Sequence, residues 1–190
     1  MPILDHFGII APFYDRVFGS TKTDVWQQVL DLPFEGLLLD AAGGTGRVAQ
    51  HLGCPACQVV VADGSFQMVY EAMKKPGLLA CATTIEQLPY ADGSFERVLM
   101  VDALHHVIDQ RQTCLEMWRV LKPGGRLVIE EPDIDTNFVK FLAVAEKLLL
   151  MRSHFLSPDE IAGMYAGLPA EISIMRKDNI AWVIVEKKAN

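Results

Sequence analysis

A chain of 190 residues, 51% of them hydrophobic, is within the usual size of one domain and can bury a sizeable core, so we expect a single domain over residues 1–190. The formal net charge of −7, without a basic patch along the chain, argues against nucleic acid or an anionic membrane as a partner. A small neutral or cationic ligand fits this charge better.

The first twenty residues lack the pattern of a secretory signal, because acidic and aromatic residues interrupt the apolar stretch. We therefore expect a cytoplasmic chain whose four cysteines are reduced. Cys54 and Cys57 have the spacing of a zinc or redox pair, but no second pair follows at a matching distance. The sequence predicts neither a disulfide framework nor a metal site.

Two helices are expected before the first strand, within an N-terminal segment that covers residues 1–32. Residues 3–18 mix aromatic and apolar side chains with charged ones, which is typical of a helix that packs against a domain. Residues 22–32 form a second, short helix with Trp26, Val29 and Leu30 on one stripe. The core is then predicted over residues 36–186.

A short apolar run at residues 36–39 is followed by Asp40 and by a turn that contains Gly43, Gly44 and Gly46. The continuous apolar run predicts a strand buried on both faces, as in a parallel sheet. The glycines allow positive φ angles and close approach of a ligand, and a helix after them would present unpaired N–H groups. The pattern predicts a strand, a tight turn and a helix that together bind a ligand.

The charge of Asp40 selects between two ligands for this turn. Gly44, Gly46 and Ala49 match the G-x-G-x-x-G/A pattern of dinucleotide-binding proteins, and Asp63 follows at about the spacing of their ribose-binding acid. A carboxylate at Asp40 would repel a pyrophosphate but would attract an ammonium or sulfonium group. S-adenosylmethionine carries both cations and a ribose, so it is the predicted cofactor.

The segment LLLDAAGGTG, residues 37–46, resembles the first motif of the class I S-adenosylmethionine-dependent methyltransferases. Its Ala-Gly-Gly-Thr-Gly part resembles the ubiquinone and menaquinone biosynthesis C-methyltransferases, although the common form of the motif has glycine where this chain has Ala42. The resemblance extends over roughly residues 11–133. It implies methyl transfer to a small-molecule acceptor, and it places residues 11–15 as a helix or lid over the cofactor, where Tyr14 is the expected contact.

Residues 58–62 are the predicted second strand, which ends at Asp63, and residues 66–74 are a predicted helix with Ser65 as its N-cap. In a doubly wound sheet, an acid at the carboxyl end of this strand can reach a ribose bound where the strand order reverses. We therefore expect Asp63 to bind both ribose hydroxyls.

Residues 78–83 are the predicted third strand, and the loop after it departs from the family that the chain resembles. That family usually has an Asp, which contacts the adenine amino group, where Thr84 stands here. In this chain the contact is expected from the Thr84 hydroxyl or from the backbone around Ile85.

Residues 97–101 are the predicted fourth strand, and Asp102, His105 and His106 follow it. The carboxyl ends of strands in open α/β sheets are where ligands bind. Adjacent histidines cannot face one point, so a two-histidine metal site is not expected. Either histidine is a candidate catalytic base, because the imidazole titrates near neutral pH, and the alternative for each is a packing or capping role.

A predicted helix at residues 110–121 ends at Lys122-Pro-Gly-Gly, and the fifth strand at residues 126–131 follows. Glu130, Glu131 and Asp133 cluster there, but their spacing matches no cation-binding set. We expect them to form a solvated rim, or one of them to orient a substrate hydroxyl.

Residues 137–151 are apolar nearly all round but too few to span a bilayer, which needs about 20 apolar residues. Such a helix has to be covered, by the sheet, by a second subunit in a homodimer or by an apolar substrate. Ser157 and Glu160 have the spacing of a capping box, and residues 171–175 and 180–185 are a predicted terminal hairpin.

Together these elements predict a doubly wound, Rossmann-like α/β sheet of about seven mostly parallel strands, with helices on both faces and a C-terminal antiparallel hairpin. The predicted function is S-adenosylmethionine-dependent methyl transfer, for which no nucleophile of the chain is required. The candidate catalytic residues are Tyr14, His105 and His106. The predicted cofactor contacts are Asp40, Ala41, Ala42, Gly43, Gly44, Gly46, Asp63, Gly64, Ser65, Met68, Thr84, Ile85, Glu86, Asp102, Ala103 and Leu104. The alternatives are an NAD(P)- or flavin-dependent oxidoreductase and a non-catalytic cofactor-binding protein.

Overall fold

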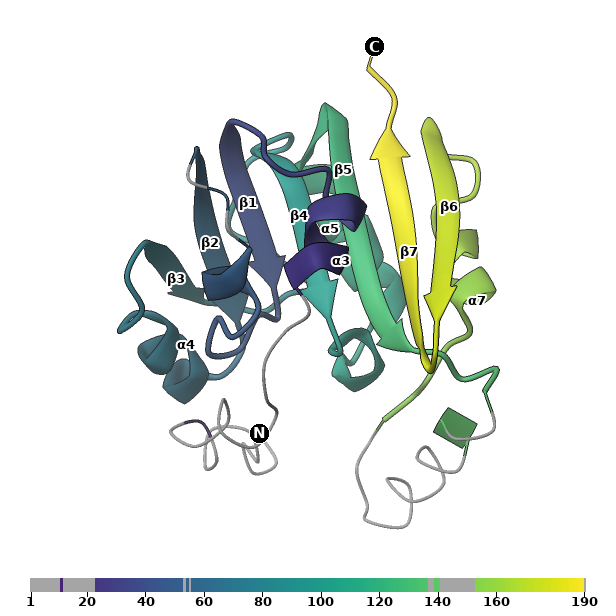
Figure 1. Cartoon of the computed structure of the whole chain (residues 1–190), viewed down its shortest axis with the longest axis horizontal. Helices are drawn as coiled ribbons and strands as arrows, with labels where there is room; N and C mark the ends of the chain where they lie inside the picture. The colour runs from purple at the N-terminus through teal and green to yellow at the C-terminus, as the bar shows by residue number, and fades with distance from the viewer. Residues whose placement is uncertain are drawn as a thin grey trace.

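The computed structural model of the chain describes residues 11, 23–52, 54, 56–136, 139–140 and 153–189. The strands in these residues are β1 (Gly36–Ala41), β2 (Cys57–Asp63), β3 (Leu78–Ala82), β4 (Phe95–Val101), β5 (Leu121–Pro132), β6 (Ala170–Lys177) and β7 (Ile180–Lys187). They form one sheet in the order β3-β2-β1-β4-β5-β7-β6 (Figure 1). The first five are parallel, and β7 runs antiparallel to β5 and β6. The predicted mostly parallel sheet with a terminal hairpin is confirmed.

The apolar run of β1 lies at the centre of the sheet. Leu39 is the register partner of Val60 on β2 and of Val98 on β4, so β1 is paired on both sides. Leu38 and Leu39 point to opposite faces, and both are fully buried. Because each face of β1 is covered, the run needs no polar alternation, as its sequence predicts.

Helices cover both faces of the sheet: α3 (Thr23–Val29) and α4 (Phe66–Ala72) on one, α5 (Gln110–Val120) and α7 (Pro158–Gly163) on the other (Figure 1). On the first face Trp26 and Ala72 pack with the strands, and on the second Met117 and Ile161 do so. Two short 3₁₀ helices, η2 (Ala49–His51) and η3 (Leu104–His106), follow β1 and β4. The doubly wound architecture is confirmed.

The α-helix predicted directly after the glycine turn is wrong. Residues 42–48 form turns, and only η2 follows them. Gly46 has a left-handed φ of 71°, which the residues of an α-helix do not adopt, so the glycine turn cannot continue directly into a helix.

Other local predictions hold, with shifted boundaries. Ser65 caps α4 by accepting a hydrogen bond from Met68 N, and Ser157 and Glu160 form the capping box of α7. The strand expected at residues 126–131 begins earlier, at Leu121, with a register irregularity opposite β4. A Cβ at Gly125 would lie 2.8 Å from the Lys122 carbonyl oxygen, which explains a glycine in this bend.

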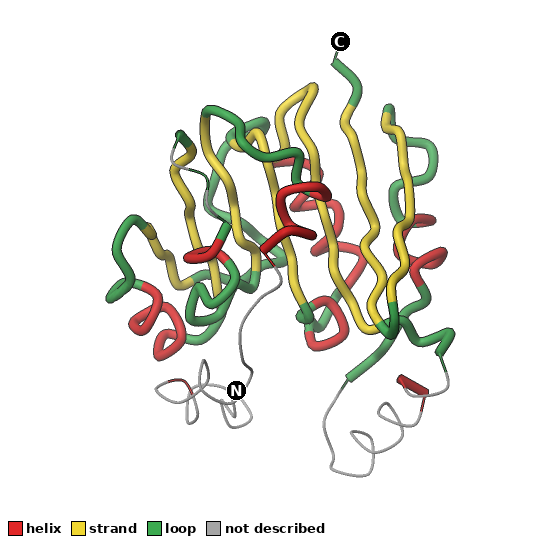
Figure 2. The backbone as a smooth tube through the Cα atoms, viewed as in Figure 1, coloured by secondary structure: helices red, strands yellow, loops and turns green. Residues whose placement is uncertain are grey.

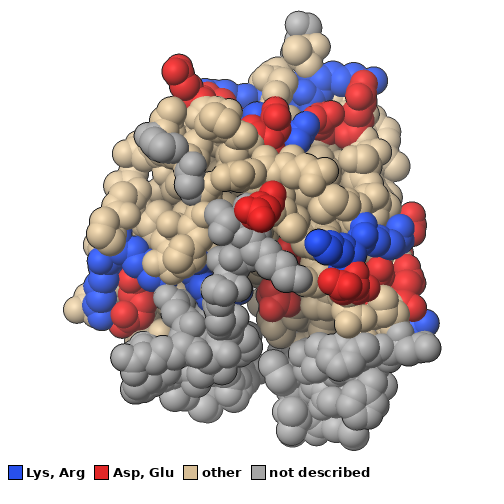
Figure 3. Space-filling model, viewed as in Figure 1, with Lys and Arg blue, Asp and Glu red and all other residues tan. Residues whose placement is uncertain are grey.

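Several predictions lie outside the described residues: the helix at residues 3–18 with Tyr14, apart from residue 11, and the apolar helix at residues 137–151, apart from residues 139–140. Among the described helices, none is both long and apolar enough to cross a membrane. On the face shown in Figure 3, basic and acidic side chains are interspersed.

Candidate functional site

A cavity of about 370 Å³ lies where the order of the strands reverses, beside the carboxyl ends of β1, β2 and β4. The loops after these strands gather at that edge of the sheet (Figure 2). The predicted cofactor contacts that line it are Asp40, Ala42, Gly43, Gly44, Asp63, Gly64, Ser65, Met68, Thr84, Ile85, Glu86, Asp102 and Ala103. The structure therefore brings residues from four separate predicted motifs to one cavity.

Asp40 is a buried carboxylate on the cavity wall. It is 1% exposed, and neither of its side-chain oxygens has a hydrogen-bond partner among the described residues. Burial, and then the negative charge of Asp63, raise its pKa from 3.8 to about 7. A Cβ on Gly43 would lie 2.5 Å from the Asp40 Cγ, so the turn can fold over this carboxylate only with glycine there. The wall thus presents an anion that a cationic ligand would satisfy.

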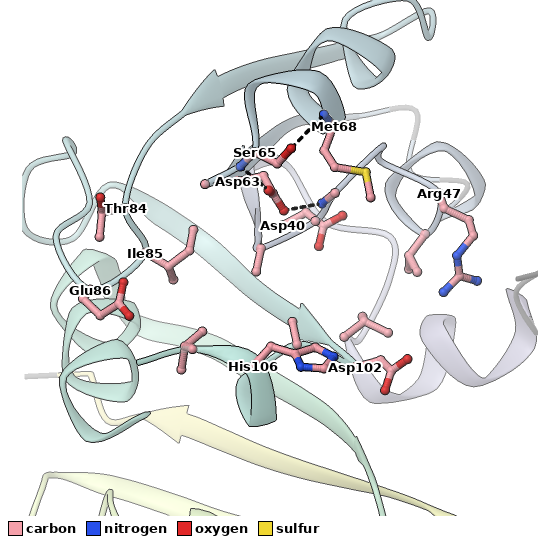
Figure 4. Close-up of a pocket in the computed structure, with 18 of the residues that line it drawn as sticks. Asp40, Arg47, Asp63, Ser65, Met68, Thr84, Ile85, Glu86, Asp102 and His106 are labelled. Atoms are coloured by element: carbon pink, nitrogen blue, oxygen red, sulfur yellow. Dashed lines mark hydrogen bonds between the residues drawn. The ribbon is translucent and has the colours of Figure 1, made fainter. Parts of the chain in front are cut away.

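Asp63 connects the glycine turn to the start of α4. Its Oδ2 accepts a hydrogen bond from Gly44 N at 2.9 Å, and its Oδ1 accepts one from Ser65 N at 2.8 Å. These two contacts orient the Asp63 carboxylate on the cavity wall. Figure 4 shows Asp63 beside Asp40, across the cavity from Asp102 and His106.

Two residues other than glycine have left-handed backbones at this cavity, Ala42 with φ 55° and Asp102 with φ 52°. A residue with a Cβ pays a steric cost in this conformation, and such strain tends to cluster at functional sites. Ala42 lies two residues after Asp40, Asp102 directly follows β4, and both residues line the cavity.

Arg47 is a cavity residue that the sequence reasoning missed. It lies on the wall, and its Nε is buried without a hydrogen-bond partner among the described residues. Its positive charge lowers the pKa of Asp40, against the larger effect of burial. The available signal was a lone basic residue directly after the Gly-Thr-Gly turn. The remaining wall residues that were not predicted are Val48, Val101, Val107 and Ile108.

The two histidines occupy different environments. His106 lies on the cavity wall, and its Nδ1 is 3.3 Å from Ser153 Oγ. Burial, and then the neighbouring His105, lower its pKa from 6.5 to about 4, so its imidazole is neutral at physiological pH. His105 is buried behind the wall, where its Nδ1 lies 2.5 Å from Glu131 Oε2. Only His106 can contact a ligand in the cavity.

The solvated rim expected from the acids after β5 is wrong. Glu131 and Asp133 are 5% and 4% exposed. Glu131 Oε1 accepts hydrogen bonds from Ala103 N at 2.9 Å and Leu104 N at 2.7 Å, so this side chain holds the turn that enters η3. Glu130 is partly buried, and burial raises its pKa to about 7. The reason is long-range, because β7 pairs with this end of β5.

Three predicted contacts do not line the cavity. Ala41 and Leu104 are buried in the core. A Cβ on Gly46 would lie 2.6 Å from Leu78 Cδ1, so Gly46 serves close packing on the side of β3. Within the described parts of the chain, no group of three or more His, Cys, Asp or Glu side chains is arranged to hold a metal ion.

The sequence comparisons point to one family. A family model described as a methyltransferase domain matches residues 39–129. Demethylmenaquinone methyltransferase of Paenarthrobacter aurescens is 33% identical over 133 residues, which cover 66% of this chain and 53% of that protein. Ubiquinone/menaquinone biosynthesis C-methyltransferase of Geotalea daltonii is 34% identical over 146 residues, which cover 68% of this chain and 62% of that protein. The chain therefore spans between 53% and 62% of the length of these relatives.

Solved structures share the fold. A crystal structure of an S-adenosylmethionine-dependent methyltransferase from Thermotoga maritima has a TM-score of 0.77 at 23% identity, covering 96% of this chain and 98% of that one. Another from Methanosarcina mazei has a TM-score of 0.70 at 17% identity, covering 90% and 100%. The family model, the sequence relatives and the shared fold together make this chain similar to the class I S-adenosylmethionine-dependent methyltransferases.

Proposed function

We propose that the chain transfers a methyl group from S-adenosylmethionine to a small-molecule acceptor. The observation that carries this proposal is the Asp40 carboxylate, buried on the cavity wall with both oxygens lacking a partner among the described residues. Burial of a charge without a partner is costly, and a cationic ligand removes this cost. A dinucleotide would bring its pyrophosphate close to Asp40, which favours S-adenosylmethionine over the nicotinamide or flavin alternative.

The charges on the wall fit the parts of this cofactor. Asp40 would attract the ammonium group of its methionine end, and the guanidinium of Arg47 would pair with the carboxylate there. Asp63, held by two backbone N–H groups, would accept hydrogen bonds from the ribose hydroxyls. Asp102 and Ala103 would flank the methyl group. Tyr14, the expected lid contact, lies outside the described residues and stays a prediction.

When bound, S-adenosylmethionine supplies a methyl group that its positively charged sulfur already activates. The chain therefore has to orient donor and acceptor in line and keep water away. His106 is the described histidine on the wall, and with a pKa near 4 it would serve as a neutral hydrogen-bonding group toward the acceptor rather than as a strong base.

The class of acceptor is inferred from the names of the relatives. Relatives of this chain are named for C-methylation in ubiquinone and menaquinone biosynthesis. A quinone precursor is the acceptor class that we propose.

The proposed cofactor site is tested by calorimetric titration with S-adenosylhomocysteine. Wild-type protein should bind it, and Asp63→Ala should weaken binding by roughly 1.5–3 kcal/mol, the scale of hydrogen bonds to a charged group. Asp24→Ala, on the exposed surface of α3, is the matched control and should bind as the wild type does. Unchanged affinity in Asp63→Ala would remove the ribose assignment.

A thermal-unfolding panel separates the rival functions. A ligand at about 100 times its Kd stabilises a protein by roughly 2.7 kcal/mol. Stabilisation by NADH or FAD, with none by S-adenosylhomocysteine, would indicate an oxidoreductase. Tight binding of S-adenosylmethionine without methyl transfer to any quinone precursor would favour a non-catalytic binding protein.

A further inference from the structure

We propose that the Glu86 carboxylate recognises the amino group of the cofactor's adenine and thereby selects an adenosyl over an inosyl cofactor. This inference rests on the proposed function, because it concerns the same cavity. With the ribose at Asp63 and the methionine end at Asp40 and Arg47, the base extends toward the remaining wall, which Ile85, Glu86 and residues 107–108 form. Figure 4 shows Ile85 and Glu86 at the end of the cavity opposite Arg47.

Only one of the two carboxylate oxygens of Glu86 makes hydrogen bonds within the described residues. It follows β3 in the loop at residues 83–88, and its Oε1 accepts hydrogen bonds from Ile108 N at 3.1 Å and from Asp109 N at 3.5 Å. Its Oε2 has no hydrogen-bond partner among the described residues. One oxygen therefore ties the loop to the start of α5, and the other is available to a ligand in the cavity.

The chemistry of this end of the cavity fits adenine. Ile85 is buried, and Val107 and Ile108 add apolar side chains to the same wall, so a flat ring can pack there. An ionised carboxylate accepts hydrogen bonds and cannot donate them. The adenine amino group donates, so Glu86 Oε2 suits it, whereas the carbonyl oxygen of hypoxanthine at the same position would be repelled.

Thr84 also lines this end, but it cannot make the same distinction. Its hydroxyl both donates and accepts, so it would bind an amino group or a carbonyl oxygen. Thr84 is exposed and carries no charge, whereas Glu86 is half-buried, where a charged hydrogen bond is less screened by water. We therefore assign the selection of adenine over hypoxanthine to Glu86.

The bonds at Oε1 make the variant Glu86→Gln a directed test. Two backbone N–H groups donate at that position, so the amide oxygen of glutamine takes the place of Oε1 and the amide NH₂ takes the place of Oε2. The group that faces the base thereby changes from an acceptor to a donor. The variant should lose affinity for adenine and gain affinity for hypoxanthine while the loop stays attached to α5.

The experiment measures the Kd values of S-adenosylhomocysteine and S-inosylhomocysteine by calorimetry for wild type, Glu86→Gln and Thr84→Val. Wild type should prefer the adenosyl compound by tenfold or more, and Glu86→Gln should reduce this ratio by at least tenfold. Glu35→Gln, an exposed change of the same kind before β1, should keep the wild-type ratio. Equal thermal-unfolding midpoints of Glu86→Gln and wild type would confirm that the loop is intact.

Three outcomes would count against the inference. An unchanged ratio in Glu86→Gln would overturn it, and so would a loss of selectivity that follows Thr84→Val instead. If wild type binds neither compound, the proposed function itself falls, and this inference with it. Binding of S-adenosylhomocysteine with an unchanged ratio would remove only the role of Glu86.

Discussion

At the residue scale, Asp40 is held where its ionised form costs stability. Burial raises its pKa from 3.8 to about 7, so the folded protein binds the Asp40 proton more tightly than the unfolded chain does. The stabilisation that results from this proton is complete below pH 3.8 and is lost as the pH rises through about 7. Asp40→Asn should therefore stabilise the ligand-free protein at pH 8 by up to about 4 kcal/mol, and have little effect at pH 4. Urea unfolding at both pH values checks this, and an equal change at both would contradict the assigned cause.

Ala42 stores backbone strain beside the same carboxylate. Its φ of 55° costs an alanine roughly 1–2 kcal/mol, and the greater freedom of an unfolded glycine offsets about 0.5–1 kcal/mol of that. Ala42→Gly should raise the free energy of unfolding by up to about 1 kcal/mol, measured in denaturant. Ala82→Gly in β3, where φ is not positive, is the control and should be destabilising. If Ala42→Gly destabilises the protein as Ala82→Gly does, glycine does not relieve backbone strain at position 42.

At the scale of elements, Glu131 joins β5 to the turn before η3. Its Oε1 accepts hydrogen bonds from Ala103 N and Leu104 N, and its Oε2 lies 2.5 Å from His105 Nδ1, all in the protein interior. Glu131→Ala would leave buried donors without partners, at about 1–3 kcal/mol each, so we expect a loss of about 3 kcal/mol or more in urea unfolding. Asp109→Ala, which removes only the exposed N-cap of α5, should cost about 1 kcal/mol. Equal losses of unfolding free energy in the two variants would mean that Glu131 contributes no more to stability than the Asp109 N-cap does.

At the scale of the whole molecule, predictions from the sequence succeeded where the cause is local. The apolar runs located the strands to within a few residues, and the Ser65 and Ser157 caps were predicted because a cap involves neighbours in the chain. Asp40 and Asp63 were predicted on the wall because acids at the ends of adjacent parallel strands meet at one edge.

The failures involve contacts between distant segments. The burial of Glu131 depends on β7, about fifty residues further along the chain, and on backbone N–H groups after β4. Arg47 lies in a turn and lines the same cavity as Glu86 and Asp102, which come from distant loops. Gly46 had the expected left-handed φ but a different neighbour, Leu78. These contacts join residues that are far apart in the sequence, so no short stretch of the sequence predicts them.

The Asp40 carboxylate, which lies under Gly43, also makes cofactor binding depend on pH. Because burial raises the pKa of Asp40 to about 7, a fraction of the ligand-free molecules carry a proton on Asp40 near neutral pH, and the ammonium group of a bound ligand would favour the deprotonated form. Uptake of S-adenosylhomocysteine should therefore expel a fraction of a proton, so that the heat of binding varies with the ionisation enthalpy of the buffer. The affinity should increase as the pH rises from 6 and level off above about 7, and Asp40→Asn should abolish both effects.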